Sequence, residues 1–411
     1  TWDQDLVAGA KISAVVYGSL AYLACFALIV HARVPYRVAW LVLLLASSTT
    51  FLYRMSLPRA PTLMLVTLVG AVWLLFTRRY AWLAVVSFLA VWLYSLFPLL
   101  GVLAVFWAGT VWLEERRLEW RPVAWVAAGI LLGLVVNPYF PDNLNLFYEH
   151  LRVAVDVDQP ERGNEWLPLP LTAVPRVAGT ALVAQMVGWA LLLRRRYSRG
   201  RPPVVFLLLV SSTLFALTLY SRRFVEYWPP FAIIFMAYAA KPLLERIAWD
   251  RLSSPAARAR ALAGVALATI AALVPLTVYL AKPVDPTWGV YPQLYHGATQ
   301  WLEANTPERS MVYNLDWEDF PPLFCFDTHN VYVCGLNLSY LYDADRELGA
   351  LYQEIKTGRR DDPGRVIRDR FGARYVFATT RSGAFLEKAR AEGLMRPVYA
   401  DRYTFVFEIP E

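Results

Sequence analysis

Arginines in two short segments are the side chains of this sequence best suited to bind an anion. Residues 53–59 and 221–230 each lie between two apolar stretches. A guanidinium group binds a phosphate through paired hydrogen bonds, so both segments are candidates for contact with a lipid phosphate. The alternatives are headgroup anchoring for the first segment and a structural Arg–Glu pair at the interface for the second. The candidate residues are Arg54, Arg59, Arg222, Arg223, Glu226 and Tyr227.

Acidic residues form two further candidate sites. Asp142 and His150 belong to a long loop over 138–170, whose carboxylates can hold a divalent cation, act as a general base or stay solvated. Residues 316–319 follow a predicted strand, where loops often bind ligands. Sugar binding by an aromatic ring among carboxylates and a capping turn are both compatible with this segment. The acceptor or cleft candidates are Asp142, His150, Asp316, Trp317, Glu318 and Asp319.

The sequence lacks the signatures of several classes of soluble enzyme. It contains no phosphate-binding P-loop, no Gly-x-Ser-x-Gly elbow, no His-Glu-x-x-His and no Gly-x-Gly-x-x-Gly.

Cys325 and Cys334 flank a turn-like stretch and can form a disulfide in an oxidising compartment or remain two buried thiols. His329 is the one imidazole near them, so we predict no metal site there. No cofactor is predicted with certainty from the sequence. A divalent cation is the one cofactor that these residues leave open.

Hydrophobic residues determine the class of protein. Apolar side chains make up 57% of the 411 residues and the mean hydropathy is +0.37, which excludes a soluble globular protein and a disordered one. We predict a polytopic α-helical membrane protein with about ten transmembrane helices over 1–281, followed by a C-terminal extracytoplasmic α/β domain over 282–411. Because proline lacks a backbone donor, we divide 80–113 at Pro98. The predicted spans are 11–30, 38–53, 61–76, 80–96, 98–113, 122–137, 176–193, 203–220, 228–244 and 261–281.

Charged residues predict the orientation. Alternate loops hold seventeen and seven Lys and Arg residues, and the positive-inside rule places the richer set in the cytoplasm. With an even number of spans, both chain ends and both arginine segments then lie outside, in a protein of the inner (cytoplasmic) membrane. The net charge is +7 overall and −4 over 282–411, so the basic excess lies beside the apolar runs. This distribution indicates membrane lipids as partners and argues against nucleic acid.

The last part of the chain alternates between helical and strand patterns, which implies a small α/β layer. Asp343 is a plausible N-cap and Gly358 follows the end of the same helix. A Pro-containing stretch over 282–289 is the expected link to the membrane part. The predicted helices are 293–304, 343–356, 363–371 and 383–392, and the predicted strands are 310–315, 331–334, 374–378, 397–400 and 403–409.

The layout of these soft motifs resembles bacterial glycosyltransferases of the GT-C superfamily, the relatives of protein mannosyltransferases and of oligosaccharyltransferase catalytic subunits. The resemblance covers most of the chain and includes no invariant signature. It rests on segments 53–59, 137–139, 222–227, 301–307, 316–320 and 371–376.

This resemblance implies an inverting transfer of a sugar from a polyprenyl-phosphate-linked donor to an acceptor on the outer face of the membrane. Members of the superfamily carry an essential acidic residue in the first outer loop. Here that loop is expected upstream of Thr1, or is represented by its last residues, which include Asp3 and Asp5. The chain is therefore expected to be an N-terminally truncated fragment of a cell-envelope enzyme.

Two other classes of function stay open beside the glycosyltransferase. One is a transporter or flippase-like protein with an extracytoplasmic binding domain. The scarcity of charged residues in the middle of the predicted spans counts against it. The other is a non-catalytic membrane scaffold, because the acidic residue of the outer loop is not identified.

Overall fold

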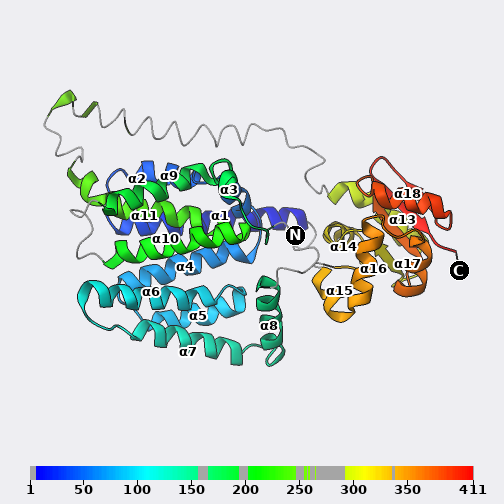
Figure 1. The fold of residues 1–411 in the computed structure, drawn as a ribbon, viewed down its shortest axis with the longest axis horizontal. Coiled ribbons are helices and arrows are strands. Elements are labelled where there is room, and N and C mark those ends of the chain that lie inside the picture. Colours follow the sequence, from blue (N-terminus) through cyan, green and yellow to red (C-terminus); the bar gives the residue numbers. More distant parts are fainter. Residues whose placement is uncertain are drawn as a thin grey trace. The chain divides into compact units, whose positions relative to one another are not determined.

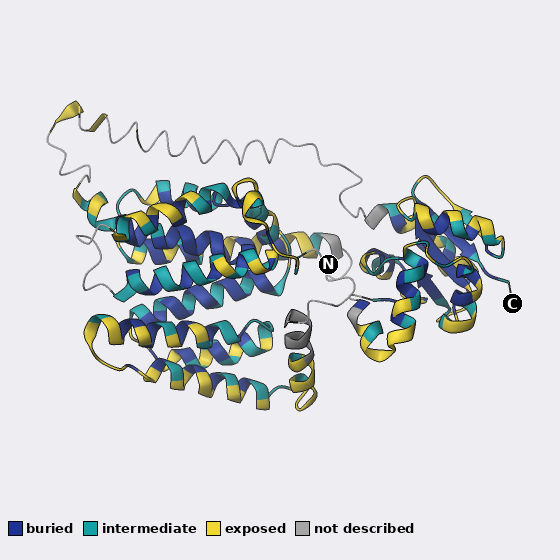
Figure 2. Cartoon of the chain, viewed as in Figure 1, coloured by how far each residue is buried: buried dark blue, intermediate teal, exposed yellow. Residues whose placement is uncertain are grey.

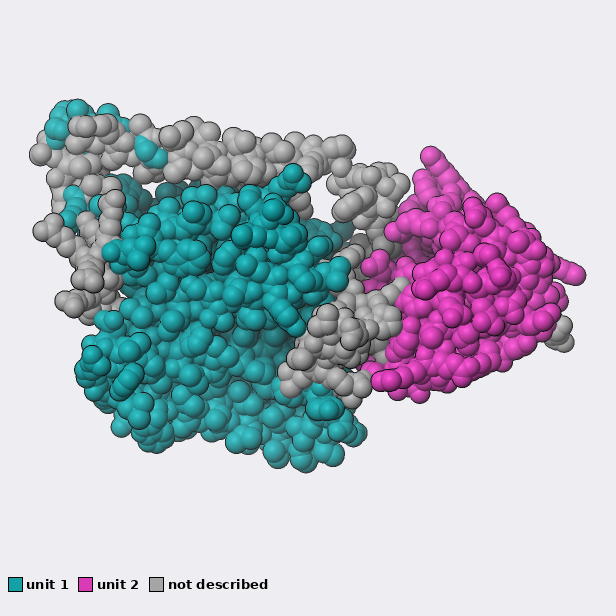
Figure 3. All heavy atoms as spheres, in the orientation of Figure 1, with its two compact units in different colours: residues 1–158, 162–282 teal, residues 159–161, 283–411 magenta. Residues whose placement is uncertain are grey.

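In the computed structural model, the chain folds into two compact units. The first consists of residues 1–158 and 162–282 and the second of residues 159–161 and 283–411 (Figure 3). The structure describes residues 6–155, 165–193, 202–246, 254–256, 258–259, 264, 292–335 and 338–410.

Unit 1 is a bundle of helices. Most of its helices run side by side along one direction, and α8 stands across the end of the bundle (Figure 1). The described helices are α1 (Leu6–His31), α2 (Arg37–Leu45), α3 (Thr49–Met55), α4 (Ala60–Phe76), α5 (Trp82–Leu93), α6 (Pro98–Glu115), α7 (Arg121–Val135), α8 (Asp142–Val155), α9 (Val174–Leu193), α10 (Pro202–Tyr220) and α11 (Trp228–Arg246).

The predicted count of about ten spans is not confirmed. Among the described residues, four helices are long and apolar enough to cross a membrane, and the pair α2–α3 adds a fifth if it forms one span. Helix α5 has 12 residues, which at about 1.5 Å per residue is shorter than a bilayer core of about 30 Å. The predicted span over 261–281 lies outside the described residues except for Gly264.

Two of the sequence-based predictions, the division at Pro98 and the span over 38–53, can be compared with the observed helices. The division at Pro98 is confirmed, because α5 ends at Leu93 and Pro98 is the first residue of α6. The single helix predicted over 38–53 is wrong, because two helices, α2 and α3, meet there at an angle of 84°. Ser48 is the reason for the bend: its side chain accepts a hydrogen bond from the Phe51 amide and so begins a new helix.

Helix α11 lies at the centre of the bundle. It packs against α1, α2, α9 and α10, and its residues from Trp228 to Phe235 are all buried. Figure 2 shows this buried core and exposed residues on outer helices such as α7. The exposed residues of α5 and α7 include large apolar side chains, such as Trp82, Leu131 and Leu132. An exposed apolar surface of this kind fits a lipid environment, because lipid replaces water as its neighbour.

Glycines allow α5 and α7 to pack closely. A Cβ atom at Gly129 would collide with the backbone carbonyl of Ala84, and one at Gly133 would lie 3.0 Å from the carbonyl oxygen of Phe88. Trp92 of α5 donates a hydrogen bond to the carbonyl of Gly133 across the same contact, at 3.1 Å. The helix backbones therefore touch directly, as small residues permit in membrane bundles.

Replacing Gly129 by valine is expected to destabilise unit 1 by about 3 kcal/mol, because the obstacle is backbone and cannot rotate away. Thermal unfolding of the detergent-solubilised protein measures the effect. The control is Gly101→Ala, because a Cβ at Gly101 meets no atom within 4 Å, and this variant is expected to be as stable as the wild type or slightly more stable. An unchanged melting temperature for Gly129→Val would contradict the close packing of α5 and α7.

Unit 2 is built around a five-stranded sheet with the order β2-β1-β3-β5-β4. The first three strands are parallel, and β5 is antiparallel to both β3 and β4. The strands are β1 (Met311–Asn314), β2 (Val331–Tyr332), β3 (Tyr375–Thr379), β4 (Arg396–Ala400) and β5 (Thr404–Glu408). The helices are α13 (His296–Asn305), α14 (Phe320–Phe326), α15 (Leu338–Ala344), α16 (Arg346–Lys356), α17 (Pro363–Phe371) and α18 (Gly383–Glu392).

Helices cover both faces of this sheet. On β3, Val376 and Ala378 belong to the cluster that contains residues of α16, α17 and α18, while Tyr375 and Phe377 belong to the cluster with residues of α13 and α14. Successive side chains of a strand point to opposite faces, so a strand between two helical layers is apolar throughout. The expected α/β layer is confirmed, with one correction: the N-cap of α16 is Asp345, whose carboxylate accepts hydrogen bonds from the amides of Glu347 and Leu348, and not Asp343.

Candidate functional site

The two arginine segments of the sequence lie against each other in unit 1. Arg54 is in the last turn of α3, and Glu226 ends the short helix η3 (Arg222–Glu226) between α10 and α11. The guanidinium of Arg54 lies 3.1 Å from the carboxylate of Glu226, and that of Arg59 lies 4.0 Å from it. The bend between α2 and α3 is what brings Arg54 here. Ser48 also donates a hydrogen bond to the carbonyl of Val177, which fastens the start of α3 to α9.

Glu165 joins the arginines into one cluster. Its carboxylate lies 2.8 Å from Arg54, 3.4 Å from Arg59 and 3.3 Å from Arg223. Glu165 is one of the carboxylates of the 138–170 loop, for which cation binding, general-base catalysis and solvated charge were the alternatives. We call Arg54, Arg59, Arg223, Glu165 and Glu226 the arginine cluster.

The backbone of Glu165 is fixed by η3. Its carbonyl accepts hydrogen bonds from the Arg223 amide at 2.8 Å and from the Ser221 hydroxyl at 3.1 Å. The Arg222 amide donates to the carbonyl of Leu167 at 3.0 Å. The chain around Glu165 is therefore held as an extension of η3, although the two segments are more than fifty residues apart in the sequence.

Two aromatic rings hold the guanidinium of Arg223. It lies 4.5 Å from the centre of the Trp166 ring and 5.5 Å from that of Tyr94, and it donates a hydrogen bond to the Tyr94 hydroxyl. Cation–π contacts with both rings restrict the side chain. Tyr94 and Trp166 thus contact the arginine cluster, and neither was predicted from the sequence.

Arg222 and Tyr227 lie outside the arginine cluster. Arg222 is exposed, and its Nε atom donates to the carbonyl of Pro168 at 3.2 Å. Tyr227 is fully buried beneath η3 and faces the core of the bundle. Three of the four arginines of the sequence analysis therefore come together, and the fourth points elsewhere.

The cluster carries a positive excess. Burial opposes ionisation of the Glu165 carboxyl, but Arg223, Arg54 and Arg59 outweigh it and hold its pKa below the ordinary value. Burial, together with the charge on Glu165, raises the pKa of the fully buried Glu226 above its ordinary value despite the same arginines. Three guanidinium groups thus face one firmly ionised carboxylate and a second one whose charge is disfavoured.

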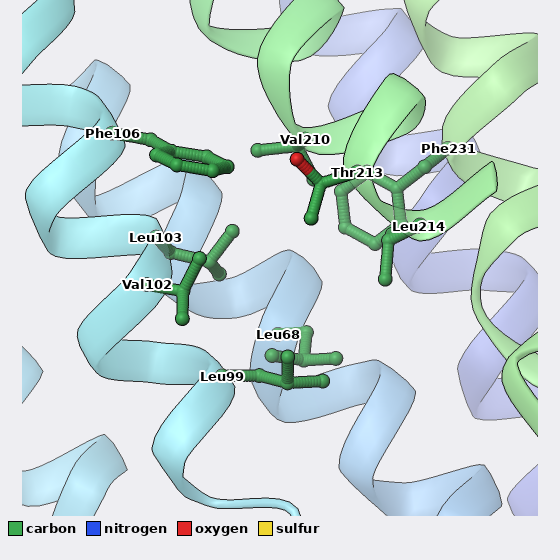
Figure 4. Close-up of a pocket in the computed structure, with 9 residues that line it drawn as sticks. All are labelled: Leu68, Leu99, Val102, Leu103, Phe106, Val210, Thr213, Leu214 and Phe231. Atoms are coloured by element: carbon green, nitrogen blue, oxygen red, sulfur yellow. The ribbon is translucent and has the colours of Figure 1, made fainter. Parts of the chain in front are cut away.

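An apolar crevice lies among four helices of unit 1. It has a volume of about 20 Å³ and is lined from α4, α6, α10 and α11 (Figure 4). Leu99 is in the first turn of α6, just after Tyr94, and Phe231 is in the first turn of α11, just after Glu226. Two residues that line the crevice therefore follow closely in the sequence on Tyr94, which contacts Arg223, and on Glu226.

Unit 2 holds a polar pocket of about 120 Å³ at the carboxyl ends of β1 and β3. Asp316, Glu318 and Asp319 reach it from the segment after β1, Arg381 from the segment after β3, and Lys356 from α16. The carboxylate of Asp316 lies 3.0 Å from the ammonium of Lys356. Ligands of α/β sheets commonly bind at the carboxyl ends of adjacent parallel strands.

Asp319 is the buried acid of this pocket. The hydroxyl of Tyr295 donates to its carboxylate at 2.6 Å. Burial raises the pKa of Asp319 to about 7, with a further contribution from the charge of Asp316 and an opposing one from the hydrogen bond of Tyr295. Its charge therefore changes near neutral pH.

Two of the remaining candidates, Trp317 and Asp142, do not join either site. Trp317 packs against the core of unit 2, and Asp142 is exposed in the first turn of α8. The side chain of His150 lies outside the described residues. Cys325 and Cys334 do not form a disulfide, which decides between the two open alternatives in favour of thiols. Within the described ranges, no group of three or more His, Cys, Asp or Glu residues is arranged to hold a metal ion.

Comparison with solved structures shows what this fold is similar to: it is like that of an archaeal oligosaccharyltransferase. The crystal structure of the oligosaccharyltransferase of Archaeoglobus fulgidus in its apo form superposes with a TM-score of 0.65 at 13% sequence identity. The match covers 98% of this chain and 63% of that one, so this chain spans less than two thirds of its length. The length and apolar composition of its helices, together with this likeness in fold, indicate that the protein is a membrane protein.

Two further structures of this archaeal protein also match. One is tethered to an acceptor peptide with an NVT sequon and has a TM-score of 0.58 at 13% identity, covering 98% of this chain and 63% of that one. The other, named AglB, is in complex with an inhibitory peptide and a dolichol-phosphate; its TM-score is 0.61 at 14% identity, covering 97% and 63%. No protein-family model matches the sequence, and no curated protein sequence is similar to it.

Proposed function

We propose that this protein is a glycosyltransferase that moves a sugar from a polyprenyl-phosphate-linked donor to an acceptor on the extracytoplasmic face of the membrane. The observation that carries the proposal is the convergence of Arg54, Arg59 and Arg223 on one position. A donor of this class joins a phosphate to an isoprenoid chain, and so needs a basic site beside an apolar surface. The crevice between α6 and α10 supplies such a surface near the cluster.

The arginines act on the leaving group. As the acceptor nucleophile attacks the anomeric carbon of the sugar, the bond from that carbon to the phosphate oxygen breaks and negative charge accumulates on the phosphate. Guanidinium groups that are already held in place by aromatic rings and carboxylates stabilise this charge without reorganising. The likeness in fold to AglB, which has been solved with a dolichol-phosphate, supports a phosphate-linked lipid as the donor.

The polar pocket of unit 2 is our candidate for acceptor binding. It combines the carboxyl groups of Asp316, Glu318 and Asp319 with two cations, and it presents hydrogen-bonding groups of both kinds to a small polar ligand. The positive-inside distribution of Lys and Arg supports an orientation in which this unit and the arginine cluster are both extracytoplasmic, in a bacterial inner membrane.

A transfer assay tests this function. The full-length protein in liposomes is given a panel of polyprenyl-phosphate-linked sugars, and release of the polyprenyl phosphate is measured. The double variant Arg54→Ala, Arg59→Ala is expected to slow the release by about 100-fold or more, because two charge-assisted contacts to the leaving group are lost. The matched control is Arg222→Ala, which removes a neighbouring arginine that lies outside the cluster.

The same liposomes distinguish the alternatives. Movement of intact donor across the bilayer without release of the sugar would favour the transporter. Full activity of the Arg54 and Arg59 double variant would contradict the role that we assign to the cluster.

A further inference from the structure

Glu165 stands where an external anion would be expected. Three guanidinium groups from separate parts of the chain lie within 3.4 Å of its carboxylate. Such convergence of cations on a single acidic group is the arrangement of an anion-binding site, with the anion supplied by the protein itself.

Solvent reaches this carboxylate. The Glu165 side chain is 24% exposed and that of Arg59 is 33% exposed, whereas Glu226 behind them is fully buried. An anion that approaches the arginines from solvent therefore meets Glu165 before it meets Glu226. Displacing Glu165 needs only a side-chain rotation, because its backbone is tied to η3 through Arg223 and Ser221.

We propose that the Glu165 carboxylate occupies the position of the donor phosphate, and that the phosphate binds by displacing it from Arg54, Arg59 and Arg223. This inference rests on the proposed function. In the absence of donor, Glu165 compensates the charge of the three arginines, which would otherwise face each other unpaired in a half-buried site. It also sets a threshold, because an incoming anion must interact with the arginines more strongly than a carboxylate does.

Binding of geranyl phosphate, a short prenyl monophosphate, tests this displacement. Isothermal titration of the full chain in nanodiscs is expected to show about tenfold tighter binding for Glu165→Gln than for the wild type, since the amide has the same shape but no charge with which to compete. If Glu165 instead serves to position the arginines, the same variant binds more weakly. The direction of the change therefore separates the two roles.

Two controls distinguish competition by the Glu165 carboxylate from a general effect of changing the net charge of the cluster. Glu226→Gln removes a carboxyl group from behind the arginines and is expected to change the affinity by less than Glu165→Gln does. In Glu165→Ala, added sodium acetate is expected to restore weak, wild-type-like binding by filling the vacated position, and acetate should affect the wild type less.

The outcomes are distinguishable from failure of the proposed function. Equal affinity of wild type and Glu165→Gln, or equal gains for Glu165→Gln and Glu226→Gln, would overturn the displacement while the arginines remain the phosphate site. Binding of geranyl phosphate that does not depend on Arg223 would overturn both.

Discussion

Arg223→Ala is expected to weaken the binding of a prenyl phosphate by two orders of magnitude or more. Arg223 contributes a charge-assisted contact, which is worth about 1.5–3 kcal/mol, and its stacking between Trp166 and Tyr94 fixes the guanidinium before the ligand arrives. Titration of geranyl phosphate into the full chain in nanodiscs measures the effect.

Arg223→Lys separates charge from geometry. Lysine keeps the charge but lacks the planar group that stacks on aromatic rings and forms paired hydrogen bonds, so we expect it to recover a minor part of the lost affinity. Arg222→Ala should bind as the wild type does. If Arg222→Ala and Arg223→Ala lose affinity equally, the arginines act only through general attraction, and a defined site is excluded.

Asp319→Asn is expected to remove a pH dependence from the stability of unit 2. The pKa of this carboxyl is about 7 in the folded protein and 3.8 as its ordinary value. The folded state therefore holds a proton that the unfolded state releases, and stability falls as the pH rises from about 4 to 7. At about 1.36 kcal/mol per pH unit, this difference corresponds to a loss of about 4 kcal/mol above pH 7. Asparagine carries no charge and still accepts the hydrogen bond of Tyr295.

Hydrogen exchange of the amides of β1 and β3 in the full chain follows this stability across pH 4 to 8. The wild type is expected to lose protection as the pH rises, relative to the Asp319→Asn variant, and the two should converge near pH 4. Glu318→Gln is the matched control, because this neighbouring side chain is exposed. Parallel curves for wild type and Asp319→Asn would show that the Asp319 carboxyl is not buried as described.

The secondary structure of unit 2 could largely be predicted from the sequence, except for helices α14 and α15. The helix over 363–371 coincides with α17, and the strand over 374–378 differs from β3 by one residue at each end. These elements have clear punctuation, such as Pro363 at a helix start and Gly372 after its end. Helix α14 was missed because its seven residues include Pro321 and Pro322, which suit a first helical turn but resemble a loop.

In unit 1, apolar runs predicted helices but not their mutual angles. The bend between α2 and α3 has a signal in the sequence, since Ser47 and Ser48 interrupt an apolar run and serine favours an N-cap. A hydropathy window averages over such a pair. The bend decides the site, because it directs Arg54 toward η3.

Four residues of the arginine cluster could be predicted from the sequence, including Glu226, but Glu165 could not. Arginines in loops that are predicted to lie outside the membrane run against the positive-inside bias, so the sequence singled them out. Glu165 is one of several carboxylates in its loop, and its contacts to Arg54 and Arg223 join segments that are separated by 111 residues in one case. Pairings of this kind depend on the packing of the whole bundle.

The most direct test of the central claim is a structure of the full chain with geranylgeranyl phosphate, determined by electron cryo-microscopy in nanodiscs. The account predicts phosphate density in contact with Arg54, Arg59 and Arg223, the prenyl chain along the crevice lined by Leu99 and Phe231, and the Glu165 carboxylate turned away. Phosphate bound elsewhere, with the contacts of Glu165 to the three arginines intact, would contradict it.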